Sequence, residues 1–171
     1  FGVLLGLLWL VSTSAKELPS LPALTSPVLD QAELFSLEEK QLLEAEIRSF
    51  LPHVQFQVWT LPTLNGLPIE ELSIRAVEKW KLGTEANDNG VLLLIVSKDR
   101  KMRIEVGQGL EGSLPDVVAS RTIREILTPH FRENLYYEGT RTALRRLYTR
   151  ASGLPAAGET PEEAQFAEQR A

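Results

Sequence analysis

The sequence contains no cysteine and only two histidines among its 171 residues. The lack of cysteine excludes disulfide bonds, thiolate catalysis and cysteine-ligated zinc, and two histidines are too few for a histidine-rich metal centre. Basic charge is also in the minority, because 18 Lys and Arg stand against 23 Asp and Glu and give a net charge of −5. We therefore predict no nucleic-acid partner and no adsorption to anionic lipid through charge alone.

Long hydrophobic runs are scarce as well, and the longest opens the chain. Residues 1–11 are almost purely apolar, and small residues follow as far as Ala15. This pattern is typical of the hydrophobic region and cleavage zone of a secretory signal, and it is shorter than the about 20 residues that span a bilayer. We predict that residues 1–15 are an incomplete signal peptide or N-terminal membrane segment, with a buried core helix as the alternative. The expected location is exported, periplasmic or otherwise extracytoplasmic, with a membrane tether as one option.

Composition divides the rest of the chain into three parts. Residues 16–27 are rich in Pro and Ser, which predicts a linker, and residues 28–151 form the predicted domain. Residues 152–171 are rich in Ala, Gly, Glu and Pro and hold one aromatic side chain, so we predict a flexible tail there.

Apolar periodicity predicts an α/β fold for the middle part. The spacing favours helices at about 36–51, 68–83, 113–129 and 136–151, and strands at 55–59, 91–96 and 102–106. Ser36 and Glu39 have the spacing of a capping box at the start of the first helix. The unbroken apolar run 91–96 is typical of a central strand covered on both faces. We predict a three-layer-like sandwich with a mixed central sheet, made of a parallel crossover and an antiparallel hairpin, flanked by about four helices.

Chain connectivity then brings three acidic residues to one rim of this sheet. The strand–helix–strand segment 55–96 predicts a right-handed parallel crossover, and the short link 97–101 makes the third strand antiparallel to the second. The start of the central strand must therefore lie beside the end of the third strand, at residues 107–112. This arrangement predicts that Asp88, Glu111 and Asp116 lie on a common rim.

These three carboxylates are the candidate metal ligands. Oxygen ligands, completed by loop carbonyls, suit hard cations, so the candidate ion is Ca²⁺ or Mg²⁺. No nucleotide cofactor is expected, because Gly107-Gln-Gly109 lacks the strand–glycine–helix setting of a dinucleotide site. Structural alternatives remain open: Asp88 in a turn, and Glu111 as a solvated loop charge. Asp116 has the spacing to complete a capping box with Ser113.

A small basic cluster lies at the opposite end of the central strand. It consists of Lys98, Arg100, Lys101 and Arg103 in and after the predicted hairpin. Such a cluster is typical of a solvated edge that discourages strand pairing. The alternative is a contact with lipid head groups or with an acidic partner.

Several linked motifs occur in a fixed order between residues 22 and 150. They are Val28-Leu-Asp30, Leu34-Phe-Ser36, Trp80-Lys-Leu-Gly83, Asp88-Asn-Gly90, Arg103-Ile-Glu-Val-Gly107-Gln-Gly109-Leu-Glu-Gly112 with Asp116, Pro129-His-Phe131 and Tyr137-Glu-Gly139. In this order they resemble the TPM-domain family of thylakoid lumen proteins, bacterial membrane-associated proteins and an animal receptor accessory protein. The resemblance implies an α/β sandwich, an envelope location, often a membrane anchor, an acidic rim that sometimes binds calcium, and a contested acid phosphatase activity.

The sequence is poor in groups that attack phosphorus. It has no Cys-x5-Arg, no Asp-x-Asp-x-Thr and no Arg-His-Gly motif, so a metal-bound water is the remaining nucleophile and we assign no catalytic residue. We predict an exported binding or accessory module for a membrane protein complex or another envelope protein, and lean against enzymatic activity. The alternatives are a weak metal-dependent acid phosphatase and a structural envelope domain without a ligand.

Overall fold

The computed structural model describes residues 20–160 and residue 162. The predicted signal or membrane segment 1–15 lies outside the described residues, as do residues 16–19 of the predicted linker. Within the described ranges, no helix has the length and apolar character needed to cross a membrane.

Four strands form one mixed sheet in the order β1-β2-β3-β4. They are β1 (Val28–Asp30), β2 (Gln55–Leu61), β3 (Gly90–Val96) and β4 (Lys101–Val106). Strands β1, β2 and β3 run parallel, and β4 is antiparallel to β3. The parallel crossover and the antiparallel hairpin are therefore confirmed, and the three-residue edge strand β1 is an addition that the sequence pattern did not predict.

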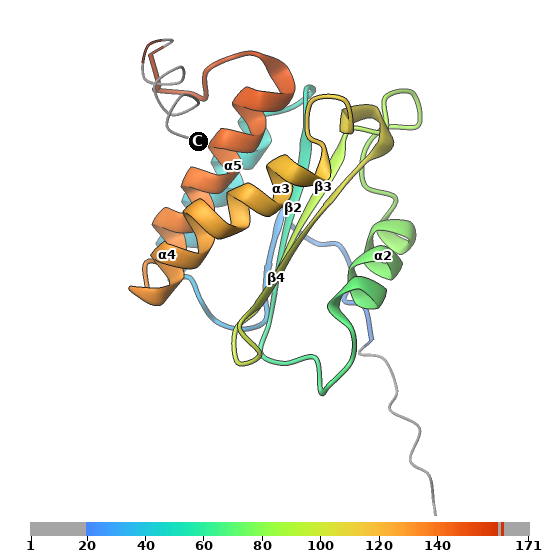
Figure 1. Cartoon of the computed structure of the whole chain (residues 1–171), viewed down its shortest axis with the longest axis vertical. Helices are drawn as coiled ribbons and strands as arrows, with labels where there is room; N and C mark the ends of the chain where they lie inside the picture. The colour runs from blue at the N-terminus through green and yellow to red at the C-terminus, as the bar shows by residue number, and fades with distance from the viewer. Residues whose placement is uncertain (1–19, 161, 163–171) are drawn as a thin grey trace, which may run out of the picture.

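Helices cover both faces of the sheet (Figure 1). One face packs against α1 (Leu37–Ser49), α5 (Tyr136–Ser152) and a continuous helical run of α3 (Asp116–Thr122), η2 (Ile123–Leu127) and α4 (Thr128–Arg132). The other face packs against α2 (Ile69–Trp80). A short 3-10 turn, η1 (Gln108–Leu110), follows β4. The predicted layered α/β sandwich with a mixed central sheet is confirmed.

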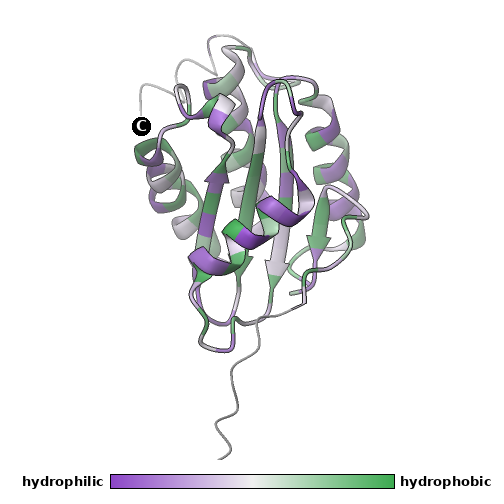
Figure 2. Cartoon of the chain, turned by 90° about the vertical axis from the view of Figure 1, so that its right-hand side faces the viewer, coloured by the Kyte–Doolittle hydropathy of each residue, from purple (hydrophilic) through white to green (hydrophobic). Residues whose placement is uncertain are grey.

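All seven residues of β3 are buried, which explains its unbroken apolar run. Val91, Leu93 and Ile95 belong to the core beneath α1 and α5, whereas the alternate residues Leu92, Leu94 and Val96 belong to the core beneath α2. Figure 2 looks onto α2 in front of the sheet, with hydrophobic residues in green.

The sequence predicted one capping box, at Ser36 and Glu39, and offered a second as an alternative role for Asp116. Ser36 accepts from the Glu39 N–H while the Glu39 carboxylate accepts from the Ser36 N–H, so the first capping box is confirmed. The capping box considered for Asp116 is wrong. Pro115 is the N-cap of α3 and makes no side-chain cap, and the Ser113 hydroxyl donates instead to the Leu110 carbonyl at 3.3 Å.

The third predicted helix does not end at Pro129 but continues to Arg132. Its middle section, η2, is π-helical, and the Thr128 N–H donates to the Ile123 carbonyl five residues earlier. Because proline has no N–H, the helix needs a local change of bonding around it. The His130 imidazole also bonds the Ile126 carbonyl at 2.8 Å, which gives this histidine a structural role.

The chain beyond α5 stays against the domain for several residues. Ala156 is buried, and Arg145 donates to the Ala157 carbonyl at 3.1 Å and to Glu159 at 3.2 Å. The same arginine and Arg141 both pair with Glu46 of α1, so this network joins α1, α5 and residues 157–159.

Candidate functional site

The turn before β3 and the loop after β4 lie side by side, as connectivity predicted. The Gly109 N–H donates to the Asp88 carbonyl at 3.1 Å, and the Gln108 N–H donates to Asp88 Oδ2 at 3.0 Å. Asp88 has a φ of 43° and so occupies the left-handed region expected for a turn. The carboxylate of Asp88 thus fixes the contact between the two segments that form the rim.

This close approach depends on two glycines. A Cβ atom on Gly107 would lie 2.3 Å from the Asp88 backbone oxygen, and one on Gly109 would lie 1.7 Å from the Asn87 backbone oxygen. No side chain fits at such distances, because they are far below van der Waals contact. The two glycines of the sequence motif Gly107-Gln-Gly109 therefore permit the close approach of two backbones.

The buried side chain of Asn89 links the rim to the chain before β2, a role that the sequence did not predict. Its side chain is 4% exposed and donates to the carbonyls of Pro52 and His53 at 2.8 and 3.1 Å. Its Oδ1 accepts from the Thr84 N–H at 3.1 Å. One amide thus satisfies backbone groups of two separate loops, which is the full use of a buried Asn side chain.

The three candidate metal ligands occupy the same end of the sheet but different elements. Asp88 lies in the turn, Glu111 follows η1, and Asp116 begins α3; all three are exposed. Across residues 20–160 and 162, no group of three or more His, Cys, Asp or Glu side chains is placed to hold a metal ion. The assignment of Ca²⁺ or Mg²⁺ to these residues stays a prediction, in which backbone carbonyls would have to supply several ligands.

A polar link ties β4 to α2. Arg103 bonds Glu105 on the same face of β4, and the Ser73 hydroxyl of α2 donates to Glu105 at 2.6 Å. The hydrogen bond that Arg103 donates to Glu105 raises the pKa of Arg103 above its usual range, and the nearby charges of Glu105, Glu70 and Asp116 act in the same direction. Arg103 is therefore paired within the fold and does not belong to the free basic cluster.

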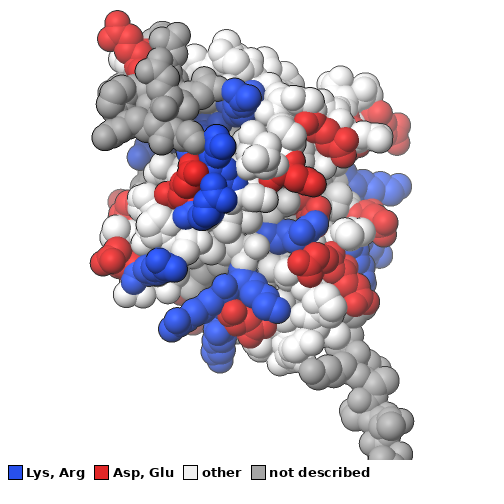
Figure 3. Space-filling model, in the orientation of Figure 1, with Lys and Arg blue, Asp and Glu red and all other residues white. Residues whose placement is uncertain are grey.

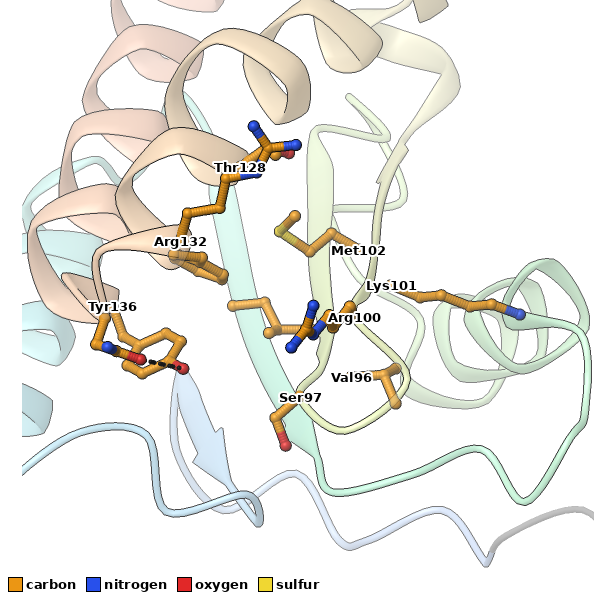
Figure 4. Close-up of a pocket in the computed structure, with 11 residues that line it drawn as sticks. Val96, Ser97, Arg100, Lys101, Met102, Thr128, Arg132 and Tyr136 are labelled. Atoms are coloured by element: carbon orange, nitrogen blue, oxygen red, sulfur yellow. Dashed lines mark hydrogen bonds between the residues drawn. The ribbon is translucent and has the colours of Figure 1, made fainter.

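A pocket of about 410 Å³ opens at the other end of the sheet, between the β3–β4 hairpin and α4 (Figure 4). Eleven residues line it: Ile95, Val96, Ser97, Arg100, Lys101, Met102, Thr128, Phe131, Arg132, Asn134 and Tyr136. Figure 3 shows Lys and Arg side chains gathered at its lower centre, over the hairpin. The basic hairpin was evident from the sequence, but Arg132 was missed because no local pattern reveals that α4 crosses beside the hairpin.

Asp99 belongs to the same hairpin but is turned to another partner. Its carboxylate accepts from the Leu64 N–H and the Thr63 hydroxyl, each at 2.9 Å. These bonds, that from the Leu64 N–H first, hold the pKa of Asp99 below its ordinary value of 3.8. This carboxylate therefore braces the hairpin against the loop after β2 and does not line the pocket.

Comparison with solved structures supports the same fold. The N-terminal domain of a protein from P. gingivalis is 35% identical, with a TM-score of 0.69 over 75% of this chain and 83% of that one. The BA42 protein of the psychrophilic bacterium Bizionia argentinensis is 16% identical, with a TM-score of 0.61 over 74% and 88%. The N-terminal domain of the cg2496 protein from Corynebacterium glutamicum is 13% identical, with a TM-score of 0.57 over 82% and 88%.

No curated protein matches the chain. The sequence pattern of the TPM domain, in contrast, matches residues 28–150, which include strands β1 to β4 and nearly the whole of α5. This span agrees with the folded region, from the first residue of β1 to the last turn of α5. The chain therefore belongs to the TPM-domain family.

Proposed function

We propose that this TPM domain is a binding module that assists a membrane protein complex, or another envelope protein, outside the cytoplasmic membrane. The location rests on the apolar residues 1–11 and on the small residues that follow them. The binding role rests on one feature of the described residues, which is the contrast between the two ends of the sheet.

At the rim, the side chains of Asp88 and Asn89 already bond within the fold. Asp88 accepts from the Gln108 N–H, and Asn89 makes three hydrogen bonds to backbone groups. At the pocket, the side chains of Arg100 and Arg132 make no hydrogen bond or ion pair with any other residue that the structure describes. Cations that a fold leaves unpaired around a concave surface are available to an external partner, which favours binding at the pocket over chemistry at the rim.

Photo-crosslinking in native membranes tests this role. We expect a crosslinker at the exposed position Lys98, beside the pocket, to give a discrete adduct with another envelope protein in cells that express the full chain. A crosslinker at the exposed position Glu38 of α1 should give none. Arg100→Gln together with Arg132→Gln should reduce the adduct by about tenfold, since truncating a paired charge in an interface commonly costs 1 kcal/mol or more. Equal labelling from both positions, or none from Lys98, would contradict the accessory role.

A second candidate is a metal-dependent phosphatase at the rim, favoured by the contact between the Asp88 turn and the loop that carries Glu111. Ca²⁺ bound only to the folded state stabilises that state by about 2.7 kcal/mol when its concentration is one hundred times its Kd. The melting temperature must therefore rise. Glu111→Gln should reduce this rise and Glu85→Gln, an exposed carboxylate outside the candidate set, should leave it unchanged. A melting temperature that does not respond to millimolar Ca²⁺ would remove the metal site and the phosphatase with it.

A further inference from the structure

We propose that the pocket between the β3–β4 hairpin and α4 binds a small organic anion, one that carries a carboxylate or phosphate-type group on an apolar body. The proposal rests on the proposed function, because it names the ligand class of the same surface. It concerns the isolated domain, however, and can be tested without any membrane partner.

The charge of the lining is of one sign. Arg100, Lys101 and Arg132 line the pocket, and no Asp or Glu does. Lys101 pairs with Val96 across the hairpin, and Val96 lies in the core beneath α2, so the Lys101 side chain lies on that face of the sheet. Figure 4 shows it pointing away from Met102. Two guanidinium groups therefore remain on the pocket side, one on each wall.

These two guanidinium groups are suited to carboxylate and phosphate. Arg100 and Arg132 are both exposed, and their side chains have no partner among the described residues. A guanidinium presents a planar fork of donors that matches two anionic oxygens, and such bonds are about twice as strong as neutral ones. The carboxylates next to them in the chain do not compete within the pocket. Asp99 is bonded to the loop after β2, and Glu133 is not among the lining residues.

The backbone of Arg100 sets where this side chain leaves the hairpin. Its φ is 52°, within the left-handed region that Gly and Asn occupy at lower cost. The Arg100 N–H donates to the Ser97 carbonyl at 3.3 Å and closes the turn.

The floor of the pocket is apolar, so a ligand that fills the pocket needs an apolar body as well as an anionic group. Ile95, Met102, Phe131 and Tyr136 contribute to the lining. The rings of Phe131 and Tyr136 pack edge to face, with centroids 5.1 Å apart, and the Met102 thioether can adapt to a ring or a branched chain. A volume of about 410 Å³ lies in the range of small-molecule pockets and far exceeds the space that inorganic phosphate needs.

The charge of the whole chain favours a small ligand over an anionic surface. The chain carries a net charge of −5, so a membrane rich in anionic lipid would repel most of the molecule. A small ligand that enters only the pocket is exposed mainly to the positive charges of Arg100 and Arg132. A compact organic anion therefore fits the observations better than a bilayer.

An amide-resolved NMR titration of residues 20–160 with three probes tests the proposal, because these residues hold the four-stranded sheet and helices α1 to α5. Phenylphosphonate should shift the amides of Arg100, Met102, Phe131 and Asn134 and saturate in the millimolar range or below. Inorganic phosphate should bind about tenfold more weakly, because it leaves the apolar floor uncovered. Benzyl alcohol, which has the ring without the charge, should not saturate. Equal affinity for phosphate and phenylphosphonate, or shifts at another surface, would overturn the proposal.

Matched variants assign the binding to the two arginines. Arg100→Gln and Arg132→Gln should each weaken phenylphosphonate binding about tenfold, as expected for loss of a charge-assisted hydrogen bond. Lys98→Gln removes the same charge from the same hairpin outside the lining, and should change the affinity less than twofold. An equal loss in all three variants would show a diffuse charge effect and refute a built site.

Two further arms separate this inference from the proposed function. Sedimentation with phosphatidylglycerol vesicles should leave the domain in solution, and vesicle binding without phenylphosphonate binding would overturn the small-ligand proposal in favour of a membrane surface. If no probe binds while the crosslinked adduct at Lys98 persists, the ligand class is wrong and the accessory role stands. If phenylphosphonate binds but no adduct forms, the ligand class stands and the accessory role is wrong.

Discussion

Gly109→Ala is expected to lower the free energy of unfolding by about 3 kcal/mol, because a Cβ atom at this position cannot coexist with the present path of the chain. The added carbon would lie 1.7 Å from the Asn87 backbone oxygen and 2.9 Å from its carbonyl carbon. Both neighbours are backbone atoms, so no side-chain rotation relieves the clash. The loop after β4 must move away from the turn before β3, and the bond from the Gly109 N–H to the Asp88 carbonyl is then lost.

Equilibrium denaturation measures this loss, and Gly112→Ala provides the control. Gly112 lies in the same loop, and a Cβ atom there would meet nothing within 4 Å. We expect its stability to stay within about 0.5 kcal/mol of the parent protein, as is usual for exposed substitutions. Equal stability of the two variants would mean that the turn and the loop do not approach as closely as described.

Much of the fold could be predicted from the sequence because its strongest signals are local. The apolar run 91–96 predicts a strand buried on both faces, since no half-exposed strand tolerates it, and β3 is buried throughout. The Ser36–Glu39 spacing predicts the start of α1 because both bonds of the capping box lie within four residues. The order and spacing of these elements then determine the parallel crossover and the hairpin.

The features that were missed depend on distant parts of the chain. Strand β1 has three residues, too few for a periodic signal, and exists because Val28 to Asp30 pair with β2. The helix passes Pro129 because η2 rearranges its bonding, whereas proline alone predicts an end. At Asp116 the capping spacing is present, but Pro115 takes the N-cap position instead.

The residues of the candidate site show the same contrast between local signals and features that depend on distant parts of the chain. Connectivity was sufficient to bring Asp88 to the loop after β4, because a hairpin and a crossover permit only one arrangement of strand ends. The placement of Arg100 and Arg132 around one pocket depends on where α4 crosses the sheet, which side-chain packing decides. Asn89 looked like an ordinary turn residue, and its buried bonds to the chain before β2 involve partners 36 and 37 residues away.

Asn89→Asp is expected to be more damaging than its small chemical change suggests, lowering the free energy of unfolding by about 4 kcal/mol at pH 7. The Asn89 amide nitrogen donates to two carbonyl oxygens in a site that is 4% exposed. A carboxylate there has no donor to offer, so an unpaired negative charge would face both carbonyls out of water. Only the bond from the Thr84 N–H would remain favourable.

Asn87→Asp is the matched control, because it places the same charge two residues earlier on an exposed side chain. Its effect should stay within about 0.5 kcal/mol. The two variants should also differ in pH dependence. Burial raises the pKa of the new carboxyl in the folded Asn89→Asp protein above the unfolded value of about 3.9, so the unfolded state loses its proton first as the pH rises and gains stability. The penalty should therefore be smallest below pH 4 and grow towards neutrality. Urea unfolding at pH 4 and pH 7 measures this change, and a penalty that stays constant between them would show that position 89 is open to solvent.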